Sequence, residues 1–175
     1  TNVNGTLFFV ADDGKHGHEL WTSDGTAAST LMVKDIIPAG WCSYPYYPMS
    51  WLMAVGNALF FVANDSVHDR ELWTSDGTAA GTMMVKDINP NGSSDPDDLR
   101  AVGDILYFSA DDGIYGREFW TSDGTEAGTA LFLDMYTGAT GSGPRYFTAV
   151  GTSVFFSAQT AALGTELWAI DLPYN

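Results

Sequence analysis

Three short acidic clusters carry the oxygen ligands that calcium prefers. They are Asp12-Asp13, Asn64-Asp65 and Asp111-Asp112, and the first residue of each lies seven residues before a glutamate. We therefore expect calcium, the one cofactor that the sequence suggests, to be held by Asp12, Asp13, Asp65, Asp111 and Asp112. A solvated Asp-Gly hairpin is the plainer alternative, because these residues favour tight turns. The chain lacks the Asp-x-Asp-x-Asp-Gly loop with a later glutamate, which is a much stronger calcium signature.

An aromatic segment between Pro38 and Trp51 forms a second candidate site. Aromatic rings stack on sugars and anchor protein partners, and prolines stiffen the chain that carries them. We expect a glycan or a protein to bind at Trp41, Tyr44, Tyr46, Tyr47 and Trp51. The alternative is that this segment folds over the end of the domain and covers its core, because aromatic side chains favour burial.

The remaining repeated polar residues are better explained by structure than by chemistry. In each Asp-Gly-Thr motif the aspartate can accept backbone N–H groups, the glycine can take a positive φ, and the threonine hydroxyl can lock the turn. We expect the glutamate of each Glu-Leu-Trp motif to be buried or half-buried, accepting hydrogen bonds from backbone or tryptophan N–H groups. The tryptophans are expected to pack between units. The histidines, at positions 16, 18 and 68, are expected in solvated loops.

The elements that position these residues follow from a repeat. Glu19-Leu20-Trp21 returns at Glu71, Glu118 and Glu166, at intervals of 52, 47 and 48 residues, which indicates tandem copies. The four units are residues 1–49, 50–98, 99–145 and 146–175. In the third unit, strand-forming residues separated by glycine-containing turns occupy 99–102, 105–110, 118–121 and 130–134.

This pattern predicts an all-β chain, with residues 1–175 forming a single β-propeller domain of four four-stranded antiparallel blades. The last blade is expected to be incomplete, because the chain stops before a fourth strand of that unit. An open β-solenoid is one alternative. Part of a larger ring completed by another chain is the other.

The second unit carries a family resemblance. Residues 71–82, Glu-Leu-Trp-Thr-Ser-Asp-Gly-Thr-Ala-Ala-Gly-Thr, and Val85-Lys86-Asp87-Ile88 resemble the bacterial repeat family named after its Glu-Leu-Trp-x-x-Asp-Gly-Thr signature. That family occurs in secreted and surface proteins, so the resemblance implies an extracellular or cell-surface location. The units are also similar to kelch blades, without the kelch double glycine. The fourth unit departs from the signature, with Ala169-Ile170-Asp171 where Asp-Gly-Thr is expected.

Composition excludes several classes of function. A formal charge of -15 repels nucleic acid phosphates and anionic lipids. Cys42 is the only cysteine, so the chain can form neither an internal disulfide nor a thiolate zinc cluster. Its apolar runs fall short of the roughly 20 residues that a membrane-spanning helix needs, and we expect no membrane insertion.

Together these features predict a binding or adhesion module rather than an enzyme. Successive turns of a meander alternate between its two ends, so the acidic hairpins and the aromatic connector should share one face, where a glycan or protein would bind. One alternative is a structural repeat that assembles with itself into a homo-oligomer or larger assembly. Another is a glycan-active hydrolase, which would need two unlike carboxyl groups in one cleft, whereas the repeat supplies the same acid several times.

Overall fold

The computed structural model describes residues 1–37 and 49–172, and within them the chain forms fifteen strands and no helix. Sheet 1 consists of β1 (Asn2–Val3), β2 (Thr6–Asp12), β3 (His18–Ser23) and β4 (Leu31–Lys34). Sheet 2 consists of β5 (Ser50–Val55), β6 (Ala58–Asn64), β7 (Arg70–Ser75) and β8 (Met83–Lys86). Sheet 3 consists of β9 (Asp97–Val102), β10 (Ile105–Asp111), β11 (Arg117–Ser122) and β12 (Ala130–Leu133). Sheet 4 consists of β13 (Arg145–Val150), β14 (Ser153–Thr160) and β15 (Gly164–Asp171).

Each sheet is an antiparallel meander, and its strands pair in sequence order. The predicted all-β architecture and the four repeated sheets are confirmed. In the third unit the observed strands begin and end within two residues of the predicted ones. Sheet 4 has three strands in the described part of the chain, so the incomplete last unit is also as expected.

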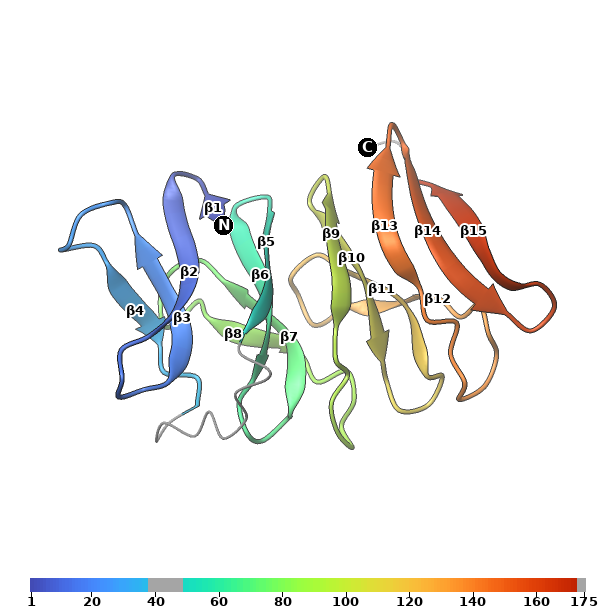
Figure 1. Cartoon of the computed structure of the whole chain (residues 1–175), viewed down its shortest axis with the longest axis horizontal. Coiled ribbons are helices and arrows are strands. Elements are labelled where there is room, and N and C mark those ends of the chain that lie inside the picture. Colours follow the sequence, from blue (N-terminus) through green and yellow to red (C-terminus); the bar gives the residue numbers. More distant parts are fainter. Residues whose placement is uncertain (38–48, 173–175) are drawn as a thin grey trace.

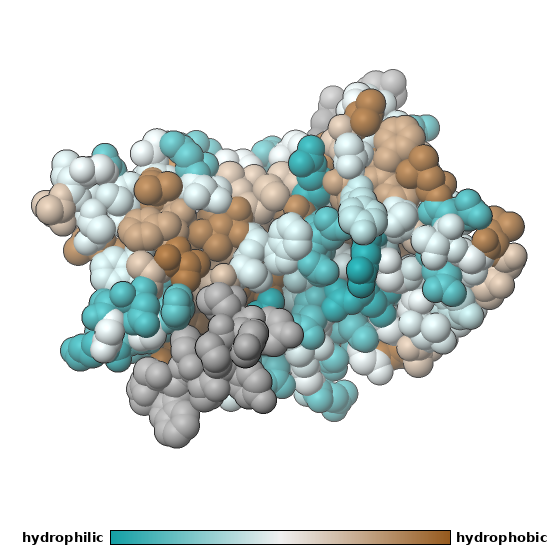
Figure 2. All heavy atoms as spheres, viewed as in Figure 1, coloured by the Kyte–Doolittle hydropathy of each residue, from teal (hydrophilic) through white to brown (hydrophobic). Residues whose placement is uncertain are grey.

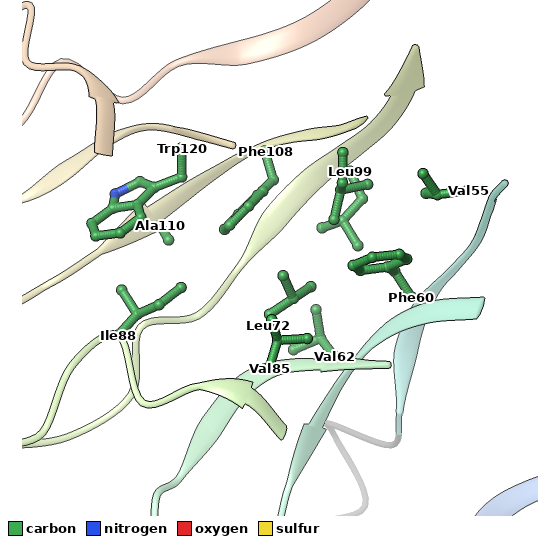
Figure 3. Close-up of a cluster of buried hydrophobic side chains, with 11 residues drawn as sticks. Val55, Phe60, Val62, Leu72, Val85, Ile88, Leu99, Phe108, Ala110 and Trp120 are labelled. Carbon is green, nitrogen blue, oxygen red and sulfur yellow. The ribbon is translucent and has the colours of Figure 1, made fainter. Parts of the chain in front are cut away.

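The hydrophobic cores lie between sheets rather than within them. Figure 3 shows one of them, in which Phe60, Val62 and Leu72 of sheet 2 face Phe108 and Trp120 of sheet 3. Equivalent clusters join sheet 1 to sheet 2 and sheet 3 to sheet 4. A strand that is apolar on both faces is typical of a sheet covered on both sides, and β6, with five consecutive buried residues, is such a strand.

The four sheets lie side by side in sequence order as an open row, with sheet 1 and sheet 4 at opposite ends of the long axis (Figure 1). Polar contacts reinforce the stacking: the Nζ of Lys34 donates to the carbonyl of Thr82 at 2.7 Å, and the Nζ of Lys86 donates to that of Thr129 at 2.9 Å. None of the core clusters among the described residues joins sheet 4 to sheet 1. The closed ring that a propeller implies is therefore not formed within the described chain.

The Asp-Gly-Thr motifs make turns, as predicted. Oδ1 of Asp76 accepts hydrogen bonds from the backbone N–H and the hydroxyl of Thr78, at 2.8 and 2.7 Å, while Gly77 has a φ of 91°. The glycine also allows close packing between sheets. A Cβ added at Gly77 would lie 3.3 Å from Cζ of Phe8 in sheet 1, and one at Gly124 would lie 3.0 Å from Cζ of Phe60 in sheet 2.

The glutamates of the Glu-Leu-Trp motif are fully buried in the first three sheets. Glu71 accepts backbone N–H groups of Ile88 and Ser94, so it ties its own strand to the connector that follows β8. Of the two predicted kinds of donor, backbone N–H groups are confirmed. The indoles of Trp21 and Trp168 donate instead to the backbone carbonyls of Ala11 and Ala158. The prediction of a buried glutamate fails in the fourth unit: Glu166 is exposed, and sheet 4 has three strands among the described residues.

Candidate functional site

A β-bulge places an aromatic side chain at the start of the second sheet. The pairing of β5 with β6 shifts register between Ser50 and Met53, and Trp51 within this bulge has a φ of 58°. A positive φ is unfavourable for a bulky residue, and the bulge turns the strand locally. At this place in the bulge, the Trp51 residue is 41% exposed to solvent.

Trp51 lines a cavity of about 570 Å³ where sheet 2 meets the connector to sheet 3. The walls come from the start of β5, the hairpin between β6 and β7, the connector and the first residue of β11. The lining residues are Ser50, Trp51, Asn64, Asp69, Arg70, Ser93, Asp95, Pro96, Asp97 and Arg117. We call this cavity the Trp51 pocket. It places an aromatic ring beside two guanidinium groups and three carboxyl groups.

Hydrogen bonds hold the two arginines of this pocket in place. Arg70 donates from Nε to Oδ1 of Asp95 at 2.9 Å and from Nη2 to Oγ of Ser50 at 3.1 Å. Arg117 donates from Nη1 to the carbonyl of Asp95 at 2.8 Å. The side chain of Asp95 is 53% exposed, compared with 15% for Arg70. Asp95 therefore links both cations and still offers oxygen atoms to a ligand.

A second, similar cavity lies next along the molecule. It has a volume of about 410 Å³ and is lined by Arg117, by residues 140–143 of the connector before sheet 4, and by Arg145 and Tyr146. Tyr146 is the sheet-4 equivalent of Trp51: it also lies in a bulged first strand, has a φ of 62° and is 73% exposed. Arg117 borders both cavities. We call this cavity the Tyr146 pocket. Figure 2 shows hydrophilic residues over the first strands of sheets 3 and 4, in this part of the molecule.

The acidic hairpins satisfy their carboxylates locally. Oδ1 of Asp13 accepts the backbone N–H groups of Lys15 and His16, and Oδ1 of Asp112 accepts those of Ile114 and Tyr115. Asp12, Asp65 and Asp111 make the same kind of bond to residues two or three positions later. Within residues 1–37 and 49–172, no three side chains that commonly ligate metals come together. Calcium binding at these hairpins stays a prediction.

The hairpin histidines pair with the same acids. Nδ1 of His16 lies 2.7 Å from Oδ2 of Asp13, and Nδ1 of His68 lies 2.7 Å from Oδ2 of Asp65. Hydrogen bonds from His16 and Lys15 lower the pKa of Asp13 to about 2. The Asp65 carboxylate raises the pKa of His68. These pairs close their own turns and lie outside the residues that line the Trp51 pocket.

The carboxyl groups with raised pKa values lie elsewhere. Burial raises the pKa of Glu19 and of Glu71 to about 7, and it also raises the pKa of Glu118. All three are 0% exposed and bonded to backbone N–H groups. A general acid must reach its substrate, and these side chains are closed off from solvent.

Of the predicted aromatic site, the structure describes only the last residue. Trp41, Tyr44, Tyr46 and Tyr47 lie outside the described residues, whereas Trp51 lines the Trp51 pocket. Residues of the β6–β7 hairpin and of the β8–β9 connector line this same pocket. This agrees with the prediction that the acidic hairpins and the connectors lie on one face of the domain. Sequence reasoning missed Arg70, Arg117, Asp95 and Tyr146. The available signal was an arginine directly before Glu-Leu-Trp and Glu-Phe-Trp, at Arg70 and Arg117.

Comparisons with known proteins bear on the fold alone. No family model matches the chain, and no curated protein is significantly similar to it. The structure resembles that of a puromycin hydrolase S511A mutant complexed with PGG, with a TM-score of 0.57 and 14% sequence identity, over 95% of this chain and 25% of the hydrolase. It also matches the computationally designed Ika4 protein at a TM-score of 0.49 and 12% identity, over 98% of this chain and 88% of that one. No helix in the described residues is both long and apolar enough to cross a membrane.

Proposed function

We propose that this chain is a binding module without catalytic activity, and that the Trp51 pocket binds a carbohydrate. The observation that carries the proposal is the exposed Trp51 ring beside Arg70, Asp95 and Arg117. Aromatic faces stack on the apolar faces of sugar rings, and charged planar groups bond sugar hydroxyls in pairs. A surface ion pair such as Arg70–Asp95 offers donors and acceptors side by side.

Binding is favoured over hydrolysis by where the acids lie. Glycoside hydrolysis needs one carboxyl group that holds a proton at working pH and another that is ionised. The carboxyl groups with raised pKa are the buried glutamates, which already accept backbone hydrogen bonds. In the pocket, Asp95 is bound to Arg70. This arrangement suits recognition of hydroxyl groups better than proton transfer.

The surrounding charge favours a neutral or cationic glycan. The formal charge of -15 disfavours polyanions at long range, even though two arginines border the pocket. A secreted or cell-surface location, implied by the repeat resemblance, is part of the same proposal, because glycans are abundant there. A protein ligand bound at the same face is the alternative.

The proposal is tested by titrating the chain with neutral tetrasaccharides of glucose, N-acetylglucosamine and mannose, and with heparin as a polyanionic comparison. Trp51→Ala should weaken binding of the preferred neutral sugar by about tenfold or more. Tyr115→Ala is the matched control, since Tyr115 is also 41% exposed but is not among the residues that line the pocket. Equal affinity of the Trp51→Ala variant and the unsubstituted chain, with melting temperatures unchanged, would refute the site.

A further inference from the structure

The two end sheets each leave bare the face that an inner sheet would cover. In sheet 1 the face turned away from sheet 2 carries the exposed Leu7 and the half-buried Phe9, Ala11 and Trp21. The equivalent residues of sheet 2 are Leu59, Phe61, Ala63 and Trp73, with the same residue types in the same order. Those four are 0 to 6% exposed because they pack on sheet 1, whereas Leu7 is 46% exposed.

Sheet 4 shows the opposite half of the same interface. Its outer face carries Val150, Phe155 and Leu167, which are the equivalents of Val55, Phe60 and Leu72. Val150 is 59% and Leu167 is 74% exposed, whereas Val55 and Leu72 are 4% and 0% exposed against sheet 3. Each end of the molecule therefore exposes one half of an interface that the chain itself forms three times.

A single contact shows how the halves would fit. Inside the molecule the aromatic ring of Phe8 lies over Gly77, and that of Phe60 lies over Gly124. Gly25 is the sheet-1 equivalent of these glycines, with a φ of 98°, and nothing lies within 4 Å of a Cβ added to it. Phe155, the sheet-4 equivalent of Phe8 and Phe60, lies on the outer face of its sheet. Sheet 1 thus has an empty glycine site, and sheet 4 has an unmatched aromatic ring.

We propose that two copies of this chain associate head to tail, with the bare face of sheet 1 in one copy packed on the bare face of sheet 4 in the other. The residues that we match across the two faces are uncharged, and the strand register adds one acid, Asp171, to the face that carries Leu167. The contact therefore brings together less negative charge than the net charge of -15 creates over the rest of the surface. The interface continues the stacking of sheets seen within the chain. Contacts at both ends would close two copies into a ring of eight sheets, and propellers of that size are known.

The head-to-tail geometry is heterologous, which separates it from a symmetric contact of one face with itself. Leu7→Asp disables the sheet-1 face and Leu167→Asp disables the sheet-4 face. Both positions are exposed, so folding should be unaffected, and Val150→Asp serves as a second sheet-4 variant if Leu167→Asp fails to melt cooperatively. Val67→Asp and Ile114→Asp are the matched controls, because they change similarly exposed apolar residues on hairpins.

Sedimentation velocity of the full chain, from micromolar to near-millimolar concentration, measures the result. We expect a dimer, and a rise in the dissociation constant of about tenfold or more for each of the two face variants, with the controls unchanged. An equimolar mixture of Leu7→Asp and Leu167→Asp should regain association, because each retains the face that the other needs. The proposal is overturned if the unsubstituted chain is monomeric throughout, if only one of the two substitutions dissociates it, or if the mixture stays monomeric.

Discussion

The hydroxyl of Ser94 donates a 2.6 Å hydrogen bond to Oε2 of Glu71, and both residues are fully buried. Ser94 belongs to the connector that leads from sheet 2 to sheet 3, so this contact fixes the connector to the start of β7. Ser142 makes the corresponding contact with Glu118 one unit later. The connector residues that line the Trp51 pocket, Ser93, Asp95 and Pro96, lie on both sides of Ser94 in the sequence. Glu71 therefore holds in place the connector that forms part of the pocket wall.

Replacing Glu71 with alanine should destabilise the fold. The backbone N–H groups of Ile88 and Ser94 would lose their acceptor, and an unsatisfied buried donor costs about 1 to 3 kcal/mol. Urea denaturation should show the loss as a lower midpoint with a similar slope. Glu166→Ala is the control: Glu166 has the same place in the motif but is exposed, so its removal should change the midpoint little. Equal effects of the two substitutions would contradict the structural role.

Stability should fall as the pH rises from about 4.5 to about 7. Burial raises the pKa of Glu19 and Glu71 from 4.5 to about 7, so between those values the folded chain binds more protons than the unfolded chain. Their stabilising effect is complete below pH 4.5 and is lost by about pH 7. The melting temperature should therefore be lower at pH 8 than at pH 5.

Salt separates this effect from general repulsion between surface acids. High ionic strength screens exposed charges but hardly affects buried groups. The difference in melting temperature between pH 5 and pH 8 should persist in concentrated sodium chloride. A difference that disappears there would mean that surface charge, rather than the buried glutamates, controls the pH dependence.

Gly124→Ala should destabilise the chain more than Gly25→Ala. Both glycines have a positive φ, of 90° and 98°, so the backbone strain of a substitution is similar. At Gly124 the new methyl would also lie 3.0 Å from Cζ of Phe60, whereas at Gly25 it meets nothing within 4 Å. Thermal melts in dilute solution, where copies stay apart, should show the larger drop for Gly124→Ala. Equal drops would mean that Phe60 moves aside without cost.

Tyr146→Ala should selectively weaken the binding of long oligosaccharides. The Trp51 and Tyr146 pockets share Arg117, so an extended oligosaccharide could contact both rings while a disaccharide reaches one. Calorimetric titration of a length series should show that Tyr146→Ala removes the gain in affinity with length and leaves disaccharide binding intact. An unchanged length dependence would restrict the site to the Trp51 pocket.

The periodic features of this protein could be predicted from its sequence. The recurrence of Glu-Leu-Trp fixes the number of sheets, and Asp76-Gly77-Thr78 identifies its turn, because local hydrogen bonds determine that turn. The Trp51 pocket depends on a bulge and on the reach of Arg70 to Asp95, 25 residues apart. Neither the bulge nor this contact leaves a recognisable pattern among neighbouring residues in the sequence. The exposure of Glu166 likewise depends on which strands surround it in the described part of sheet 4, rather than on its own motif.

Because the hydrophobic cores lie between sheets, the free energy of unfolding is approximately a sum over pairs of adjacent sheets. Each sheet contributes half of every core that it touches, so stability grows with the number of adjacent pairs rather than with the number of units. In the separate chain, sheets 2 and 3 have neighbours on both sides, and their amides should exchange with deuterium most slowly, while sheets 1 and 4 should open first. Duplication of one unit would add a complete core without altering those already present. The length of such a chain can therefore change during evolution without redesign of its interior.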